Sequence, residues 1–496
     1  MRYPLVLLRQ TGLAGAVVAA AAAAVLFGTA LPVAHADESV GNPTRVDAAS
    51  AARSRGTSTN QSDRATGPKA ASLAAQASFG INGGVQGSNN TDSGTNTGTG
   101  INLFAIGDSN SAVANNNIVG TLNGGINTTH AGNGNASAGQ NNIDGTRNLA
   151  ANDVWLGDDN TQAGRNNTSA TSVRNLIDNR ALLRHGNTSS GGNVIDGSYN
   201  LVANRPWLGD SNATSGGTQT IGDHNLVGNG VLVGDSNDTV GVSLTTGDGN
   251  IMTALVRARD QNTYVGQNTA TGDHNVVSDR VWVGGTNRQS GRNTTTGDRN
   301  VVTNTAVAGN GNTSSAGQVI TGDRNLVDNR VILGDGNTNS GGQSVTGSGN
   351  IGYHLAFVGN NNEVSAVNLV SGDRNVVVGL VLMGSGNSNS AQNFVGGGVL
   401  DVLMAVVGDD TRNSANNLDG GLNFVFVGSG SVNSGNNTSG GINIAIVGPN
   451  STDVGNCASS LCVNIFGVQF FGSAPGASNK PDAGSRLTYR RTHAQS

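Results

Sequence analysis

Aspartate recurs at one position of a repeated turn in the middle of the chain. Each copy lies in a Gly-Asp-X-Asn segment, at Asp223, Asp248, Asp273, Asp298, Asp323 and Asp373. Carboxylates are calcium ligands, so a column of them makes these residues weak candidates for a calcium site. If the repeats stack, carboxylates about 5 Å apart repel by about 1 kcal/mol even in water. Because one acid per turn gives calcium few ligands, we favour a plain turn balanced by the residue that follows each Asp. Those residues are His224, His274, Arg299, Arg324 and Arg374.

The two cysteines of the chain, Cys457 and Cys462, lie close together in the sequence. In an exported protein this spacing predicts a local disulfide, which would staple the last repeat. The surrounding stretch is strongly apolar, so we expect residues 456–472 to form a C-terminal cap. Such a cap would cover a strand edge that could otherwise pair with further strands.

Catalytic chemistry has no comparable signal. The seven His, the scattered acids and the Ser residues form neither a nucleophile triad nor a metal-ligand spacing, so we expect no enzyme and no cofactor. His354 stands where most repeats carry Asn, and we interpret it as a hydrogen-bonded variant of that position. Arg257, Arg259 and Asp260 break the local consensus, which indicates either a binding groove or, as we favour, drift between repeats.

The elements that would position these residues are tandem repeats. The Asn of a Gly-X-X-Asn anchor recurs with a constant 25-residue period from Asn187 to Asn387, and shorter 20-residue repeats lie at both ends of the array. A second anchor, usually Thr-Gly-Asp-X-Asn, lies midway in each central repeat. Gly at turns, with Asp or Asn capping them, predicts strand-turn-strand units. We therefore expect about 16 stacked coils, where one coil is one winding of the chain.

Alternating side chains predict which face of each strand is buried. After Asn325, the inward face would hold Val327, Asn329, Val331 and Leu333, because the other face carries charged residues such as Asp328 and Arg330. The second segment of the repeat would place one set of alternating residues inward: Asn312, Ser314, Ala316, Gln318 and Ile320. Stacking would join buried Asn and Gln into amide ladders that satisfy their donors and acceptors. The prediction is an all-β protein, a β-solenoid. Disorder, and a solenoid in which each half-repeat forms its own coil, remain alternatives.

The segment GNGNTSSAGQ at 309–318 resembles the curlin repeats of bacterial surface amyloid. That resemblance implies two strands paired about a Gly-Asn turn, Asn312 and Gln318 as ladder residues, and self-assembly outside the cell. Composition agrees with a repetitive β structure, since Gly supplies 76 residues and only 12% of the chain is charged. Only 8 residues are Pro, which excludes a collagen-like chain.

The ends of the chain differ from the array. Arg2 and Arg9 flank the start of an apolar run that ends near Ala34-His35-Ala36, which predicts a signal peptide at 1–36. An uncleaved membrane anchor is the alternative. We expect a disordered leader at 37–79, the solenoid at 80–455 and a flexible basic tail at 473–496. The protein would be secreted or bound to the cell surface, with no transmembrane span in the mature chain. Its formal net charge of −5 disfavours nucleic acid as a partner.

All three Trp fall at one position of the repeat, on the face predicted to point outward. The column includes Trp155, Trp207, Leu232, Trp282, Ile332, Phe357 and Leu382. Stacking would make it an apolar ridge along the rod, and we expect no such surface on the neighbouring columns. A bulge that turns the column inward, or a covering by the leader or tail, would remove it. We favour a functional surface.

The function that we expect is that of a structural or adhesive protein, which binds envelope or extracellular polymer or other copies of itself. A polysaccharide lyase of the parallel β-helix type is one alternative, because coils of this length also occur in such enzymes. An ice-binding protein is the other, because hydroxyls would line the outward face of the second segment. Those hydroxyl residues are Thr271, Thr296, Thr321, Thr346, Ser290, Ser315 and Ser340.

Overall fold

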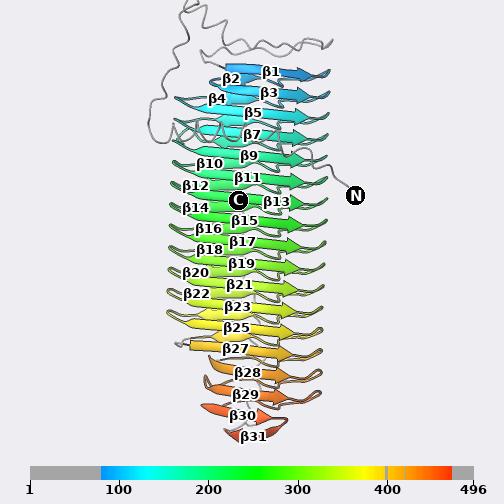
Figure 1. The fold of residues 1–496 in the computed structure, drawn as a ribbon, viewed down its shortest axis with the longest axis vertical. Helices are drawn as coiled ribbons and strands as arrows, with labels where there is room; N and C mark the ends of the chain where they lie inside the picture. Colours follow the sequence, from blue (N-terminus) through cyan, green and yellow to red (C-terminus); the bar gives the residue numbers. More distant parts are fainter. Residues whose placement is uncertain (1–79, 397–399, 419, 472–496) are drawn as a thin grey trace, which may run out of the picture.

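The computed structural model describes residues 80–396, 400–418 and 420–471, and these residues form one β-solenoid (Figure 1). No helix occurs in this part of the chain. The strands belong to two sheets of 18 and 13 strands that run along the rod. All neighbours pair in parallel except the last pair, β30 and β31, which is antiparallel.

The first sheet is built from the longer strand of each coil. Its strands are β1 (Gly80–Gln86), β3 (Gly100–Ile106), β5 (Gly124–Ala131), β7 (Leu149–Leu156), β9 (Leu176–Leu183), β11 (Leu201–Leu208), β13 (Leu226–Val233), β15 (Ile251–Ala258), β17 (Val276–Val283), β19 (Val301–Ala308), β21 (Leu326–Leu333), β23 (Ile351–Val358), β25 (Val376–Met383), β27 (Leu400–Val407), β28 (Gly421–Val427), β29 (Ile442–Val447), β30 (Leu461–Ile465) and β31 (Val468–Phe471).

The second sheet holds the short strands. They are β2 (Asn96–Thr97), β4 (Asn116–Ile118), β6 (Asn141–Ile143), β8 (Asn166–Thr168), β10 (Asn193–Asp196), β12 (Thr218–Ile221), β14 (Ser243–Thr246), β16 (Asn268–Thr271), β18 (Asn293–Thr296), β20 (Gln318–Thr321), β22 (Gln343–Thr346), β24 (Asn368–Ser371) and β26 (Asn393–Val395).

The strand register follows the repeat period. Leu201 pairs with Leu226, one long repeat later, and Ile81 pairs with Ile101, one short repeat later. The two halves of a repeat lie in different sheets, and each half stacks on the same half of the next repeat. The predicted all-β solenoid is therefore confirmed. The alternative with one coil per half-repeat is wrong, because equivalent residues stack at the full period.

The interior alternates apolar and amide layers. Val327 and Val331 are buried in two separate apolar clusters, and Asn329 is buried between them. The Asn329 Nδ2 donates to Asn304 Oδ1 at 3.0 Å, and equivalent bonds join successive coils. Since Asp328 and Arg330 point outward, the predicted inside and outside of this strand are confirmed. Bonds of this kind satisfy many of the amides in a core that holds few large apolar residues.

The predicted alternation fails in part of the second segment. Ser314 and Ala316 have φ angles of 50° and 54°, so the chain curves there instead of continuing as a strand. Ser315 is therefore buried while Ser314 is half-exposed. The Ser315 Oγ donates to the carbonyl oxygen of Thr313 at 2.9 Å, which holds the curve in place. A regular strand begins only at Gln318.

The buried glutamines also depart from the prediction. Gln318 and Gln343 stack in the second sheet, yet the side-chain amide atoms of both have no hydrogen-bond partner among the described residues. Asn side chains at the same position do pair, as in the 2.9 Å bond from Asn166 Nδ2 to Asn141 Oδ1. The amide ladder of the second sheet is thus interrupted at the glutamines and at Asn293, whose side-chain amide atoms also have no partner among the described residues.

Candidate functional site

The predicted apolar ridge lies on the outer face of the first sheet. Strand pairing places its residues in one column, which runs Trp155, Leu182, Trp207, Leu232, Arg257, Trp282, Val307, Ile332, Phe357, Leu382, Val406 and Phe426. Trp155, Trp207 and Trp282 are 43%, 56% and 50% exposed. The interpretation in which a bulge turns this column inward is therefore wrong. The leader at 37–79 and the tail at 473–496, which we considered as a covering of the ridge, lie outside the described residues.

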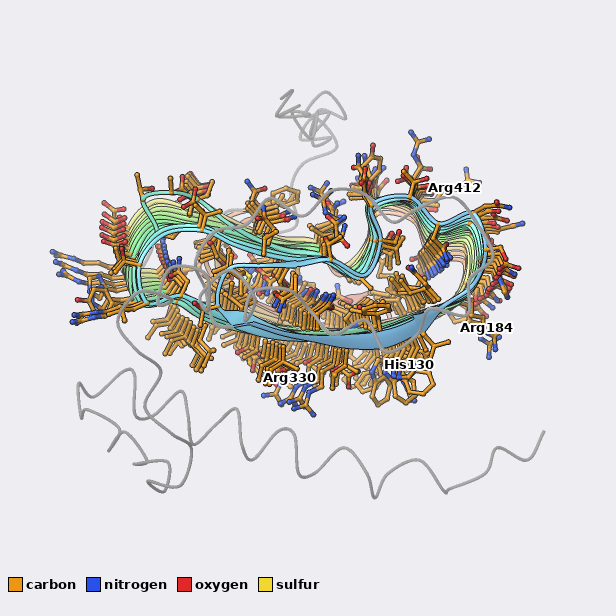
Figure 2. All side chains as sticks on the ribbon, turned by 90° about the horizontal axis from the view of Figure 1, so that it is seen from above. His130, Arg184, Arg330 and Arg412 are labelled. Carbon is orange, nitrogen blue, oxygen red and sulfur yellow. A yellow bond between two sulfur atoms is a disulfide. The ribbon has the colours of Figure 1, made fainter. Side chains whose placement is uncertain are left out.

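The outward position follows from the pleat of each strand. Leu232 lies between the buried residues Val231 and Val233, so its side chain must point to the other face. At the N-terminal end the column continues to His130, whose ring stacks on Trp155 with a centroid distance of 4.2 Å. In Figure 2, a view along the rod, His130 projects from the outer face of the first sheet.

A second exposed apolar column was missed in the sequence. It consists of the first residue of each long strand and includes Leu201, Leu226, Ile251, Val276, Val301, Leu326 and Ile351. This column lies beyond the neighbouring columns, on which we expected no such surface. A signal was available, because an aliphatic residue directly follows the Asn of each Gly-Asp-X-Asn or Gly-Ser-X-Asn anchor in these repeats.

Between the two apolar columns the outer face changes along the rod. In several of the earlier coils it carries ion pairs, such as Arg180 with Asp178 at 3.3 Å and Arg330 with Asp328 at 2.8 Å. These pairs are partly exposed and contribute little to stability. The position that Arg330 occupies in β21 is taken by Leu380 in β25 and by Met404 in β27. The outer face is therefore apolar across its whole width toward the C-terminal end.

The aspartate column is stabilised by the backbone. The Oδ1 atom of each Asp accepts the N–H of the equivalent residue in the preceding coil, as in the 2.8 Å bond from the Asp273 N–H to Asp298. The same bond joins Asp248 to Asp273 and Asp298 to Asp323. No ion pair joins this column to the His or Arg residues that follow it in the described part of the chain. The predicted balance by neighbouring cations is therefore wrong, since N–H groups take that role.

The described residues contain no cluster of side chains that could bind a metal ion. Across residues 80–396, 400–418 and 420–471, no group of three or more His, Cys, Asp or Glu side chains is arranged to hold a metal ion. The weak calcium site at the aspartate column stays a prediction.

The expected outward hydroxyl surface is only partly present. Thr271, Thr296, Thr321 and Thr346 are exposed at the ends of their short strands. Ser290, Ser315 and Ser340 are fully buried, so their assignment to the outer face is wrong. Their hydroxyl groups donate to backbone carbonyls at the curve that precedes each short strand. The single remaining hydroxyl column does not favour ice binding.

The last coil replaces asparagine with cysteine. Cys457 pairs with Asn437 of the preceding coil, and Cys462 pairs with Asn443, so each cysteine ends one asparagine column. The two residues form a disulfide. It joins the second-sheet side of this coil to β30 across the interior. The antiparallel strand β31 follows, with Val468, Phe470 and Phe471 exposed.

Three ionisable groups are buried in the interior: His354 and Asp279 in an asparagine ladder, and Asp401 in the apolar column of Val377. The His354 Nδ1 lies 2.9 Å from Asn329 Oδ1, and burial lowers the pKa of the imidazole to about 4. Burial raises the pKa of Asp279 well above its usual value, although Asn304 Nδ2 donates to its Oδ1 at 2.9 Å. Burial also raises the pKa of Asp401 to about 8. The hydrogen-bonded role predicted for His354 is confirmed.

No protein-family model, curated protein or solved structure matches this chain. The curlin resemblance therefore stays a prediction. Among the described residues, no helix is long and apolar enough to cross a membrane.

Proposed function

We propose that the protein is an exported structural or adhesive rod that attaches through its apolar ridge to envelope polymer, to an extracellular surface or to other copies of itself. One observation carries the proposal: aromatic and aliphatic side chains are exposed in one column over many coils, which only Arg257 interrupts between Trp155 and Phe426. Exposed apolar patches of this extent are typical of interaction surfaces.

The ridge can make several contacts with one partner, and the free energies of these contacts add. A Trp side chain contributes about 150–250 Å² when fully buried, and these three are about half exposed. Covering the exposed half of one ring removes roughly 100 Å² of apolar surface from water, which stabilises a complex by about 2 kcal/mol. Because the rings project from a regular sheet, a partner can contact several of them without first ordering a loop.

Export is supported by the N-terminal sequence and by the cysteines. The predicted signal peptide at 1–36 lies outside the described residues, so its cleavage is part of the proposal. The Cys457–Cys462 disulfide is typical of oxidising compartments. A protein of this kind would be secreted or held at the cell surface.

The proposal is tested by Trp155→Ser combined with Trp207→Ser. Both side chains are exposed, so circular dichroism should show an unchanged fold. Self-association in analytical ultracentrifugation, or attachment of the protein to its own cells, should weaken at least tenfold. The control is Leu255→Ser, which removes an exposed apolar side chain that lies off the ridge. Equal association and attachment in the double variant and the control would overturn the proposal.

A further inference from the structure

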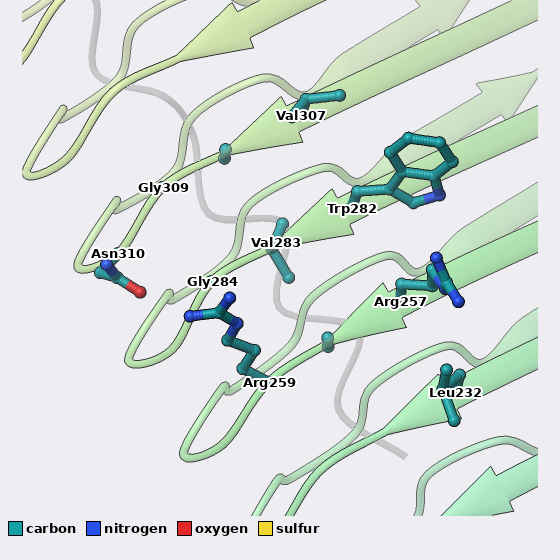
Figure 3. A pocket seen from close by; sticks show the side chains of 11 residues that line it. Leu232, Arg257, Arg259, Trp282, Val283, Gly284, Val307, Gly309 and Asn310 are labelled. Carbon is teal, nitrogen blue, oxygen red and sulfur yellow. The ribbon is translucent and has the colours of Figure 1, made fainter. Parts of the chain in front are cut away.

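The ridge is interrupted at one coil, and a groove of about 500 Å³ opens there. Arg257 takes the place of an apolar residue between Leu232 and Trp282, and Arg259 follows at the end of the same strand (Figure 3). The groove also contacts Val307 and Asn310 from the next coils.

Arg259 stands in a column that is otherwise mostly glycine. A Cβ on Gly234 of the preceding coil would lie 2.0 Å from Asp260 Oδ1, and a Cβ on Gly284 would lie 2.3 Å from Asn310 Oδ1. In these two coils the side chain that follows in the next coil leaves no room for a Cβ, whereas Arg184 occupies the same column although Asp210 follows in its next coil. Above Arg259 that following residue is Gly285, which has no side chain. Arg259 therefore lies where the next coil leaves room for a side chain.

Both guanidinium groups are free to bind a ligand. Arg257 and Arg259 are exposed and make no ion pair, side-chain hydrogen bond or ring contact with the described residues. The nearby Asp260 carboxylate already accepts the N–H of Asp235 at 2.8 Å. Trp282 presents a half-exposed indole ring beside Arg257. Two unpaired cations next to an aromatic surface therefore line the groove.

We propose that this groove binds a sugar residue that carries a carboxylate or sulfate group, as part of an acidic polysaccharide. The anion would pair with Arg257 and Arg259, since guanidinium groups hold such oxygens with two parallel hydrogen bonds. The apolar face of the sugar ring would lie on Trp282, whose flat ring suits a flat partner. This site goes beyond the proposed function, because it does not depend on attachment through the rest of the ridge.

The position of Arg257 favours a sugar over an anionic lipid. Leu232 and Trp282 lie in the same column, directly before and after Arg257 along the rod. If the ridge were immersed in acyl chains, the Arg257 guanidinium would lie at the depth of its apolar neighbours, where a cation is costly. An aqueous acidic polymer imposes no such cost.

The test measures binding of galacturonate tetramers to the full chain by isothermal titration calorimetry. The variant Arg257→Leu with Arg259→Gly carries the residues of the preceding coil, Leu232 and Gly234, and should therefore fold normally. We expect binding to weaken at least tenfold in that variant and in Trp282→Leu. The control Arg184→Gly removes another arginine that stands in the same glycine column, and it should bind as tightly as the unaltered chain.

Ligand variants separate the possible sources of the negative charge. Comparing a sulfated tetramer with the galacturonate tells which anion the groove prefers, and binding of either one supports the proposal. Equal binding of a neutral galactose tetramer would overturn it. Binding of phosphatidylglycerol vesicles without binding of either acidic sugar would also overturn it, as would undiminished binding by the double arginine variant. Because Trp155 and Trp207 stay in place here, failure of this test leaves the ridge proposal standing.

Discussion

Acid should destabilise the rod most at the coil that contains His354, because this histidine replaces an asparagine of the ladder. His354 contacts Asn329 of the preceding coil, and Gly379 of the following coil leaves room for its ring. A Cβ on Gly379 would lie 2.9 Å from His354 Cδ2, so the two residues share one space. Neither neighbour in the column carries a charge. Combining His354→Asn with Gly379→Asn should extend the asparagine ladder from Asn329 by two coils and remove the titrating group.

The size of the effect follows from the lowered pKa. In the folded chain the pKa of His354 is about 4, against an ordinary value of 6.5. The neutral imidazole therefore supports the fold fully above pH 6.5, and this stability is lost as the pH falls from 6.5 toward 4. The loss amounts to about 2 kcal/mol at pH 5 and is limited to about 3 kcal/mol at lower pH.

Hydrogen exchange of the β23 amides (Ile351–Val358) measures this locally, which suits a rod that need not unfold in one step. Between pH 7.5 and pH 5, the opening free energy of β23 should fall by about 2 kcal/mol more in the unaltered chain than in the double variant. His274→Asn is the control, because that side chain is exposed. The same pH dependence in the unaltered chain and the double variant would show that His354 is not the acid-sensitive group.

Two further predictions concern the interior. Asp401, which accepts a hydrogen bond from Asn417, has a raised pKa of about 8, so its contribution to stability is lost as the pH rises toward 8. Asp401→Asn should therefore stabilise the neighbouring coils by up to about 4 kcal/mol at pH 7, but not at pH 4. Hydrogen exchange of the β27 amides measures this difference. A gain in stability that is the same at both pH values would contradict the prediction. Val327→Asp should destabilise its coil by several kcal/mol, because it buries an unpaired charge, whereas Asp328→Ser should change little. Equal rates of limited proteolysis in these two variants would contradict the assignment of inner and outer faces.

The fold could be predicted in outline because the same pattern of buried and exposed residues recurs in many repeats. Val327 and Asn329 alternate with charged residues, and a similar alternation recurs at the equivalent positions of neighbouring repeats. The curve at Ser314 and Ala316 could not be predicted, since nothing in those two residue types requires a positive φ angle. Closing the coil imposes that conformation, and Ser315 is buried as a result.

The candidate surface was predicted only in part. The Trp column drew attention because three large rings share one register, whereas the parallel column through Leu201 and Leu226 consists of common aliphatic residues. The aspartates were misread for a different reason. Their partners are N–H groups one coil away, as for Asp273 and Asp298. A backbone N–H donor cannot be recognised from the type of residue that carries it.

The glycine that follows most long strands links each coil to the next one. Gly309 has no room for a Cβ because Asp335, one repeat later, points at it, and Gly334 is restricted in the same way by Asn360. A mutation at either member of such a pair therefore meets a constraint set in the neighbouring repeat. Duplication or deletion of one whole central repeat forms the same junction again wherever the joined repeats carry this glycine and its partner. A gene for this protein can thus lengthen or shorten the rod by one strand spacing of about 4.8 Å at a time, without finding a new fold.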